Sequence, residues 1–379
     1  MIKEILFFSI GDSNTPATWS NVPFFFAKTL EQHGIVVHRY NLAQHEKRFI
    51  VLSYKLWFKI LRYIYPNHVQ NYHRTRFFKL CAQRILKEAV TQHPNADCCL
   101  FMGYDFYNKY SEIPTILFSD WTSEMYFERI KRKAYKLEKR YIEQQKNAIN
   151  HASLVFSLFE ICAKQLHDKH PQTPIDFLGG NVINALQEPN EQLIKIKKCS
   201  GKILFIGGKK YINGAKMLIE AFQLLTKNNQ QMSLHIIGMH KTLFTDMNIN
   251  LNNVHFHGYL RKDIENERIL YYNLLSTAQI FVNPSPQWAG YSSTIEAMYF
   301  YTPIIVSPYK EFVNEFGNNL NFGLYTDNTI EKLVNSINLI IHDSNYVQLC
   351  LNAHNRVAKY TWNHYIDKFL FSVNQILKK

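Results

Sequence analysis

A polar loop between two apolar segments, within residues 281–310, holds side chains suited to binding an anion. The pattern predicts a buried strand that ends at Val282, a loop that contains two prolines, and a helix from about Ser293. A second buried strand is predicted at residues 304–307. Serine and threonine residues stand at the start of the helical run, where N-cap residues are favoured.

The start of this predicted helix offers backbone N–H groups to a phosphate or a diphosphate. Residues 290–295 leave N–H groups without helical acceptors, and the positive end of the helix dipole favours an anion there. Glu296 follows in the first helical turn, where it can accept hydrogen bonds from ribose hydroxyls. In the alternative interpretation, the serines only cap the helix and Glu296 only interacts with its dipole. The candidate donor-binding residues of this segment are Gly290, Tyr291, Ser292, Ser293, Thr294 and Glu296.

A second candidate for phosphate binding is the loop between a predicted strand at residues 202–206 and the helix that follows it. The loop begins with Gly207 and Gly208, and its spacing differs from the dinucleotide-binding pattern G-x-G-x-x-G. Lys209 and Lys210 can neutralise a diphosphate. We therefore predict that these two glycines bind the donor and that the two lysines take part in catalysis.

The N-terminal half of the chain opens as a strand–helix–strand unit. Strands are predicted at residues 4–10, 35–40, 98–104 and 115–121, with a helix at residues 24–34. Polar residues at the carboxyl ends of such strands face the crevice where doubly wound sheets bind their ligands. The candidates at these positions are Gly11, Asp12, Ser13, Gly103, Asp105, Asp120 and Thr122.

Among these residues we predict two roles. Asp120 is the candidate catalytic group, either orienting the acceptor or stabilising positive charge on the transferred sugar. In the alternative interpretation, Asp120 caps the long charged helix predicted at residues 123–148. The residues predicted to lie on the acceptor side are Gly11, Asp12, Ser13 and Asp105.

Length and composition indicate a two-domain protein. The chain has 379 residues, of which 46% are hydrophobic, so there is enough apolar material for two large cores. No segment approaches 18 consecutive apolar residues, and the N-terminus lacks the pattern of a signal peptide. The six cysteines have no C-x-x-C pair and no metal-ligand spacing, so we expect reduced, mostly buried thiols and a zinc-free protein. These features favour a cytoplasmic protein.

The net charge of +13 is concentrated in residues 47–87, which contain ten lysine or arginine residues and no acidic residue. Large apolar side chains alternate with these charges. This combination favours helices in an anionic membrane interface, with Trp57, Phe58, Phe77 and Phe78 supplying apolar contacts. One alternative is a pair of solvated basic helices whose aromatic residues belong to the core. Another is nucleic acid, for which the sequence shows no motif, so we expect no nucleic-acid partner.

The second half of the chain resembles the donor domain of retaining GT-B glycosyltransferases of the group 1, family 4 type. The segment FIGGKKYINGAKMLIEAF resembles their strand–loop–helix, and VNPSPQWAGYSSTIEAMYFYTPIIVS resembles their most typical stretch. TWSNVPFFFAKTL, SDWTS and LGGNV agree more weakly in the first half. The resemblance implies an α/β fold of two facing Rossmann-like domains with parallel sheets and an interdomain cleft.

The resemblance also implies domain boundaries and an activity. We expect an acceptor-binding domain at residues 1–182, a nucleotide-sugar-binding domain at residues 183–360, and a helix at residues 361–379 that returns to the first domain. The implied reaction is transfer of a sugar, with retention, from a UDP- or GDP-linked donor to a glycan or lipid-linked acceptor. We expect a role in bacterial surface polysaccharide synthesis, at the inner face of the membrane, without a metal or other cofactor.

Two departures from the family pattern leave an alternative open. Where the family has its first glutamate, this sequence has Trp288. Where the family has two basic residues in the glycine loop, this sequence has Gly208 and Asn213. Lys209 or Lys210 would then have to act on the phosphates. A non-catalytic relative, or one with another reaction such as nucleotide-sugar epimerisation, remains the alternative at this stage. The family's second glutamate falls on Glu296, which implies contact with the ribose.

Overall fold

The computed structural model describes residues 2–227, 231–245, 251–286 and 291–377. The chain divides into two compact units. Unit 1 consists of Met1–Gly180 and Trp362–Lys379, and unit 2 consists of Asn181–Thr361. These boundaries lie beside those expected from the sequence, at residues 182 and 360. No helix in the described ranges is both long and apolar enough to cross a membrane.

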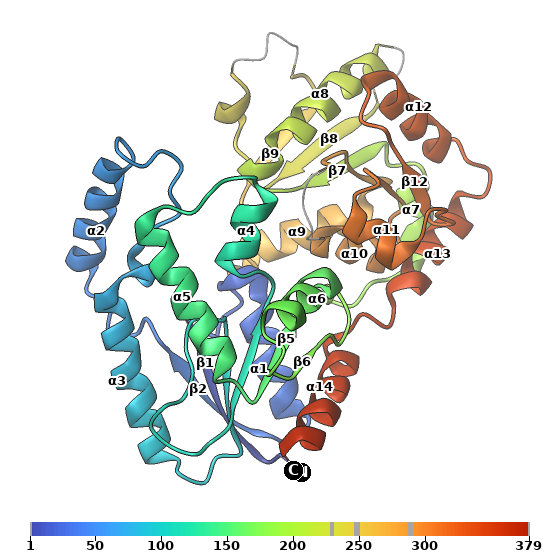
Figure 1. Cartoon of the computed structure of the whole chain (residues 1–379). Helices are drawn as coiled ribbons and strands as arrows, with labels where there is room; N and C mark the ends of the chain where they lie inside the picture. The colour runs from blue at the N-terminus through green and yellow to red at the C-terminus, as the bar shows by residue number, and fades with distance from the viewer. Residues whose placement is uncertain (1, 228–230, 246–250, 287–290, 378–379) are drawn as a thin grey trace. The chain divides into compact units, whose positions relative to one another are not determined.

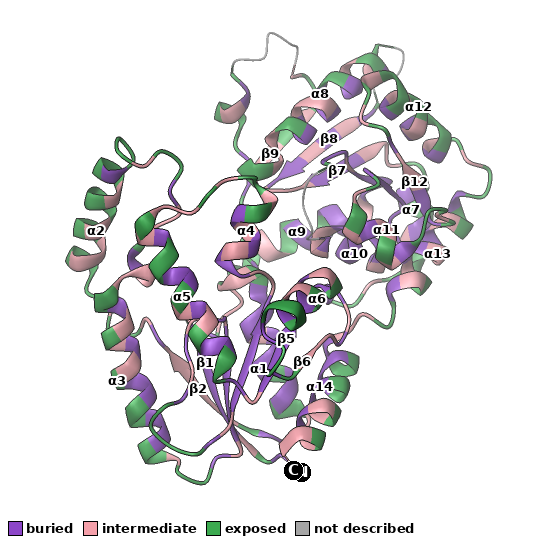
Figure 2. Ribbon diagram, in the orientation of Figure 1, coloured by how far each residue is buried: buried purple, intermediate pink, exposed green. Residues whose placement is uncertain are grey.

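Unit 1 is built on a six-stranded parallel sheet in the order β2-β1-β3-β4-β5-β6. The interior strands are continuous apolar runs, which is the pattern expected where helices cover both faces of a parallel sheet. Figure 2 shows the central strands of this sheet as buried. The strands are β1 (Glu4–Ser9), β2 (Val36–Asn41), β3 (Cys98–Met102), β4 (Thr115–Ser119), β5 (Leu154–Ser157) and β6 (Ile175–Asp176).

The helices of unit 1 include the last helix of the chain, α14, which packs on α1 (Figure 1). The Phe26 and Phe369 rings meet edge to face at 5.0 Å. The chain end thus returns to the first unit through aromatic packing in its core. The helices are α1 (Val22–Gln32), α2 (Arg48–Leu61), α3 (Arg76–Gln92), α4 (Ser123–Arg129), α5 (Lys136–Asn150), α6 (Glu160–Lys169) and α14 (Trp362–Leu377).

The single helix predicted at residues 123–148 is wrong, because the structure has two helices there, α4 and α5. Lys131 adopts a left-handed backbone conformation, with φ of 52°, which a continuous helix excludes. Glu138, in the first turn of α5, stabilises the start of that helix: its carboxylate accepts a hydrogen bond from the Tyr135 backbone N–H at 2.9 Å and pairs with Arg132. These interactions stabilise a new helix start within a sequence whose charge pattern looks continuous.

Unit 2 contains a second six-stranded parallel sheet, in the order β12-β11-β10-β7-β8-β9. Its strands are β7 (Lys202–Ile206), β8 (Ser233–Ile237), β9 (Val254–Gly258), β10 (Ile280–Asn283), β11 (Ile304–Val306) and β12 (Gly323–Tyr325). Its helices are α7 (Ile194–Lys198), α8 (Ile212–Thr226), α9 (Glu265–Thr277), α10 (Ser292–Tyr299), α11 (Lys310–Phe316), α12 (Ile330–Ile341) and α13 (Tyr346–Val357). Helix α8 packs beside α12, and α10 packs beside α13.

Candidate functional site

The strand order of unit 2 reverses between β7 and β10, which are neighbours in the sheet. From β7 the chain builds outward in one direction through β8 and β9, and from β10 in the other through β11 and β12. In open parallel sheets, ligands bind at the carboxyl ends of the strands on either side of such a switch point. The segments that leave these two ends are the glycine loop after β7 and the loop that leads to α10.

The glycine loop is tightly fitted to the strand ends around it. The Gly207 backbone N–H donates to the Ile237 carbonyl at 2.9 Å. A Cβ atom at Gly207 would lie 2.9 Å from the Tyr211 ring and 3.0 Å from the Phe205 ring. Gly238 has a φ of +98°, and a Cβ there would lie 2.6 Å from the Gly207 carbonyl oxygen. Glycine is therefore required at both positions for the β7 and β8 ends to pack together.

The structure brings the two predicted parts of the donor site together. The Ser293 hydroxyl, in the first turn of α10, lies 3.5 Å from the carbonyl of Ile206, the last residue of β7. On the other side of the loop, a Cβ at Gly214 would lie only 2.3 Å from the Ser285 hydroxyl. Gly214 therefore allows the first turn of α8 to approach the segment after β10. Among the described residues, the buried Ser285 hydroxyl has no hydrogen-bond partner.

The start of α10 differs in detail from the prediction. Its N-cap residue is Tyr291, and no side chain caps the helix, so the prediction that a serine or threonine caps it is wrong. Ser292, Ser293 and Thr294 form the first turn instead, where backbone N–H groups have no acceptor within the helix. The Tyr291 ring is buried in the core, with its centroid 5.6 Å from that of Phe316. Gly290 lies outside the described residues.

Glu296 is buried and already has two partners. Its side chain accepts a hydrogen bond from the Lys262 ammonium at 2.5 Å and from the Tyr271 hydroxyl at 2.9 Å. Lys262 also donates to the Asn184 carbonyl at 2.8 Å, and only 7% of Lys262 is exposed. Any ribose contact of Glu296 would therefore be made from a carboxylate that its neighbours already hold in place.

Lys262 is the residue of this cluster that sequence reasoning missed. It follows β9 in a short turn, and nothing in the local pattern separates it from the exposed Arg261 beside it. Tyr271 is buried in the same cluster, and its burial, together with the charge of Glu296, raises the pKa of its hydroxyl well above the usual value. The cluster can be recognised only when β9, α9 and α10 are placed together, because its members are far apart in sequence.

The two predicted catalytic lysines form a 3₁₀ turn directly after Gly208. Both side chains are exposed. The Lys210 ammonium lies 4.9 Å from the centre of the Tyr211 ring, a cation–π contact. Lys209 stands at the same turn beside the switch point of the sheet. The two side chains therefore differ in their surroundings, although the sequence gives no reason to distinguish them.

In unit 1 the strand order reverses between β1 and β3, so the predicted acceptor residues also follow a switch point. Gly11 lies two residues after the end of β1 and has a φ of +106°, and a Cβ there would lie 2.6 Å from the Thr18 hydroxyl. The Asp12 side chain is exposed and accepts hydrogen bonds from Asn14 at 2.9 Å. Ser13 is buried, and its carbonyl accepts a hydrogen bond from Arg39 at 2.7 Å.

The other two acidic candidates lie after β3 and β4. The Asp105 carboxyl accepts a hydrogen bond from Gln145 at 2.9 Å. Burial raises the pKa of Asp105, and hydrogen bonds from Tyr141 and Gln145 offset part of that rise. Asp120 is half-buried and accepts a hydrogen bond from the Trp121 backbone N–H at 2.7 Å. Helix α4 is capped by Thr122 rather than by Asp120.

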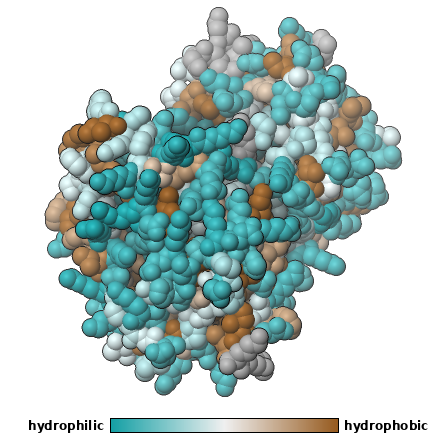
Figure 3. All heavy atoms as spheres, viewed as in Figure 1, coloured by the Kyte–Doolittle hydropathy of each residue, from teal (hydrophilic) through white to brown (hydrophobic). Residues whose placement is uncertain are grey.

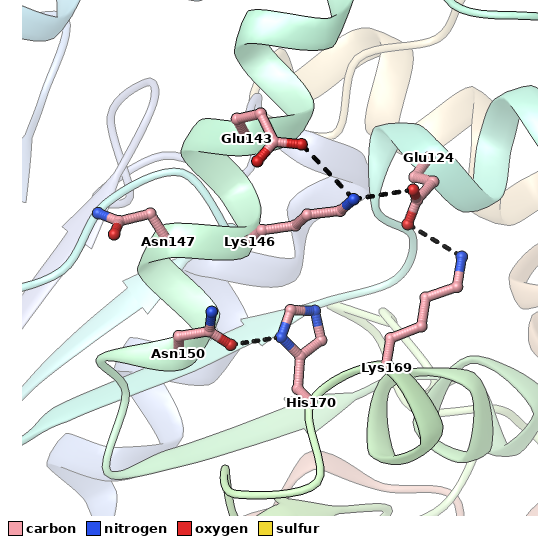
Figure 4. A pocket seen from close by; sticks show the side chains of 7 residues that line it. All are labelled: Glu124, Glu143, Lys146, Asn147, Asn150, Lys169 and His170. Atoms are coloured by element: carbon pink, nitrogen blue, oxygen red, sulfur yellow. Dashed lines mark hydrogen bonds and ion pairs between the residues drawn. The ribbon is translucent and has the colours of Figure 1, made fainter.

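A polar pocket on unit 1 lies between α4, α5 and α6 (Figure 4). Its charged groups neutralise one another: Glu124 pairs with Lys146 at 3.1 Å and with Lys169 at 2.9 Å, and Glu143 pairs with Lys146 at 3.5 Å. Burial alone would raise the pKa of Glu124, but the two lysine ammonium groups lower it. None of the predicted site residues lines this pocket.

Residues 187–361 match the family model of group 1 glycosyl transferases. This region covers the switch point of unit 2, the glycine loop and α10. The second unit is a group 1 glycosyl transferase domain. No curated protein sequence matches the chain.

Solved structures share the fold over nearly the whole length of the chain. Sucrose-phosphate synthase from Thermosynechococcus elongatus has a TM-score of 0.68 at 14% identity and covers 99% of both chains. WaaG, a glycosyltransferase involved in lipopolysaccharide biosynthesis, has a TM-score of 0.64 at 14% identity, again over 99% of both chains. HepE from Anabaena, in complex with UDP and glucose, has a TM-score of 0.61 at 15% identity and covers 97% of this chain and 99% of HepE.

These findings confirm the predicted α/β fold class. The chain has the GT-B fold, with two Rossmann-like units that each contain a six-stranded parallel sheet. With the family match in its second unit, the chain is a glycosyltransferase.

Proposed function

We propose that this glycosyltransferase moves a hexosyl group, with retention, from a UDP- or GDP-linked sugar to a glycan or lipid-linked acceptor. The proposed donor site rests on one observation: the glycine loop after β7 and the start of α10 lie side by side at the β7/β10 switch point. The Ser293 hydroxyl at 3.5 Å from the Ile206 carbonyl fixes the start of α10 beside the glycine loop. A diphosphate bound there would meet backbone N–H groups from both segments.

The proposed chemistry follows from the charge that develops on the leaving group. When the sugar–phosphate bond breaks, negative charge grows on the diphosphate. The N–H groups of Ser292, Ser293 and Thr294 and the ammonium of Lys209 or Lys210 are fixed charges and dipoles that would stabilise it. Such groups can supply this stabilisation without a metal. Asp120, at the carboxyl end of β4, would act on the acceptor or on the sugar.

The lipid-linked form of the proposed acceptor is supported by an apolar surface that helix α2 presents to solvent. Helix α2 packs on unit 1 through Tyr54, Phe58 and Leu61, which recur at helical spacing, and the Tyr54 ring lies 5.5 Å from that of Tyr72. A second apolar stripe lies on the opposite face and is exposed. Figure 3 shows hydrophobic side chains gathered over α2. The exposed members are Phe49, Leu52, Leu56, Trp57 and Ile60 on α2, followed by Tyr63 and Ile64.

The basic residues of α2 lie along one side of this exposed stripe. Lys55, Lys59 and Arg62 are spaced by four and three residues, so they share one face, and all three are exposed. A helix with this arrangement can place its apolar stripe among acyl chains while its cations contact anionic head groups. We propose that α2 attaches the enzyme to the inner face of a bacterial membrane.

Two of the four aromatic residues predicted to contact the membrane do not face outward. Phe78 is 1% exposed and packs in the core of unit 1, and Phe58 lies on the inner stripe of α2. Trp57 and Phe77 are exposed by 53% and 41%, and they stay candidates for membrane contact. The alternative interpretation, in which the aromatic residues of 47–87 belong to the core, therefore applies to Phe58 and Phe78.

The proposal of a role in surface polysaccharide synthesis, including lipopolysaccharide, rests on the same surface and on the fold shared with WaaG, a glycosyltransferase involved in lipopolysaccharide biosynthesis. An enzyme attached to the inner face of the membrane can reach a lipid-linked acceptor without releasing it to water. A non-catalytic sugar-nucleotide-binding relative is the competing hypothesis, and it predicts donor binding without transfer.

A thermal-shift screen against UDP, GDP and their hexose conjugates tests the donor assignment. A ligand present at a hundredfold its dissociation constant stabilises the native state by about 2.7 kcal/mol. We expect one nucleotide diphosphate class to raise the melting temperature, and its sugar conjugate to do so at a lower concentration. Equal responses to all species, or to none, would contradict a built donor site in unit 2.

A further inference from the structure

Three side chains from separate elements of unit 1 converge on one point, away from the switch point of its sheet. They are Glu4 at the start of β1, His38 in β2, and His93 at the end of α3. The donor atoms of all three lie within 4.8 Å of one another. None of them belongs to the sites described above.

The sheet register explains why Glu4 and His38 share a face. Leu6 is paired with His38 and Phe8 with Tyr40, and the Phe8 and Tyr40 rings stack at 5.3 Å. Alternate residues of a strand point the same way, so Glu4 lies on the face that carries these pairs. Helix α3 covers this face at its C-terminal end, where its C-cap residue His93 reaches the carboxylate.

The distances suit a tetrahedral metal ion. The His38 Nε2 lies 2.9 Å and the His93 Nδ1 lies 3.2 Å from the same Glu4 oxygen. Ligands bound to zinc at about 2.0–2.1 Å in a tetrahedron are roughly 3.3 Å apart, so only small shifts are needed. Without a metal, each imidazole can donate one N–H to Glu4, and metal binding replaces those two protons.

We propose that Glu4, His38 and His93 form a binding site for a borderline divalent cation, for which Zn²⁺ is the reference ligand. Two imidazole nitrogens and one carboxylate oxygen favour Zn²⁺, Co²⁺, Ni²⁺ or Cu²⁺ over Mg²⁺ and Ca²⁺, which prefer oxygen ligands. The three side chains are 25–31% exposed, so water can complete the coordination.

The ligands stand on backbone that is already fixed. The Asp97 carboxylate accepts hydrogen bonds from the backbone N–H groups of Lys3 at 2.6 Å and Glu4 at 2.9 Å. The backbone N–H of His93 donates to the Ala89 carbonyl at 3.0 Å as the C-cap of α3. A bound ion would join edge strand β2, β1 and α3. Its role is therefore stabilisation of unit 1 and is independent of the sugar-transfer site.

The test uses the full chain, free of affinity tags and stripped of metal by chelation. We expect Zn²⁺ at about a hundredfold its dissociation constant to raise the melting temperature by on the order of 5 °C. Co²⁺ should give the visible absorption bands of a tetrahedral site. Both signals should be lost in Glu4→Gln and in His93→Gln, which keep hydrogen-bonding side chains.

A matched control uses a histidine pair in unit 2, where His235 Nδ1 lies 3.0 Å from His257 Nε2. His257→Gln should keep both the Zn²⁺ shift and the Co²⁺ bands. The proposal is overturned if the wild-type protein shows no Zn²⁺-dependent shift. It is equally overturned if the shift survives in His93→Gln and disappears in His257→Gln. The metal-free melting temperatures of all variants show whether each one folds.

Discussion

Replacing Glu296 by alanine tests whether the buried cluster of unit 2 has the energetics that its geometry implies. The substitution leaves the Lys262 ammonium buried opposite a small apolar side chain and removes the acceptor of the Tyr271 hydroxyl. Breaking a buried ion pair from one side costs about 3–5 kcal/mol. We therefore expect Glu296→Ala to lower the free energy of unfolding by about that amount, measured by urea denaturation.

Two further variants separate the contributions. The triple variant Lys262→Met, Tyr271→Phe and Glu296→Met replaces the whole cluster by apolar groups of similar size, and it should recover most of the lost stability. Glu296→Gln keeps an oxygen acceptor for Lys262 and should fold. If Glu296 also contacts the ribose, Glu296→Gln should weaken nucleotide binding by about 1.5–3 kcal/mol, measured by calorimetry.

The reasoning is refuted if Glu296→Ala is as stable as the wild-type protein, because the carboxylate would then not balance a buried charge. A folded Glu296→Gln variant with unchanged nucleotide affinity would show that Glu296 is not part of the donor site, and it would leave the stability argument intact. Stability and binding thus test separate parts of the interpretation.

Three other predictions concern the glycine loop, Lys197 and helix α2. Lys209→Ala should lower turnover by on the order of tenfold or more. Lys210→Ala should leave turnover nearly unchanged, because the Lys210 ammonium lies over the Tyr211 ring, and equal small effects of the two variants would argue against catalysis by this loop. Lys197 is fully buried, and burial lowers its pKa to about 7, so the unfolded state binds more protons above that pH. Stability should therefore rise between pH 7.5 and 9.5, by up to about 1.4 kcal/mol per pH unit, and Lys197→Met should lack this rise in urea denaturation; parallel profiles would contradict the assignment. In flotation assays, the protein should bind anionic vesicles but not neutral ones. The double variant Leu56→Ser, Trp57→Ser should weaken the binding that remains at high salt, and the double variant Lys55→Glu, Lys59→Glu should remove the salt-sensitive part of the binding. Absence of binding at low salt would exclude α2 as a membrane-binding surface.

Much of the fold could be predicted because strands buried on both faces are continuous apolar runs in the sequence. β1, β3 and β4 were located in this way, and the glycines after β1 and β7 marked strand ends. The break between α4 and α5 escaped prediction because the left-handed Lys131 carries no glycine or proline signal. Its cause is the Arg132–Glu138 pair and the cap at Tyr135, which only the folded chain displays.

The candidate site shows the same limit. The loop after β7 and the start of α10 could be predicted to bind one ligand, since both follow strands and both contain glycine or serine at the turn. The partners of Glu296 could not, because Lys262 and Tyr271 reach it from other elements. Residues 47–87 could be recognised from the sequence as basic and apolar, but which aromatic residues of α2 face outward depends on the packing of Tyr54, Phe58 and Leu61.

The most direct test of the proposed function is release of nucleoside diphosphate. A panel of UDP- and GDP-linked hexoses is incubated with the protein and with glycan and lipid-linked acceptors, and free diphosphate and glycosylated product are measured by mass spectrometry. We predict release from one donor, matched by an equal amount of product that keeps the anomeric configuration, and strongly reduced in Lys209→Ala. Binding of a nucleotide sugar without release of diphosphate on any acceptor would contradict sugar transfer and support a sugar-nucleotide-binding protein.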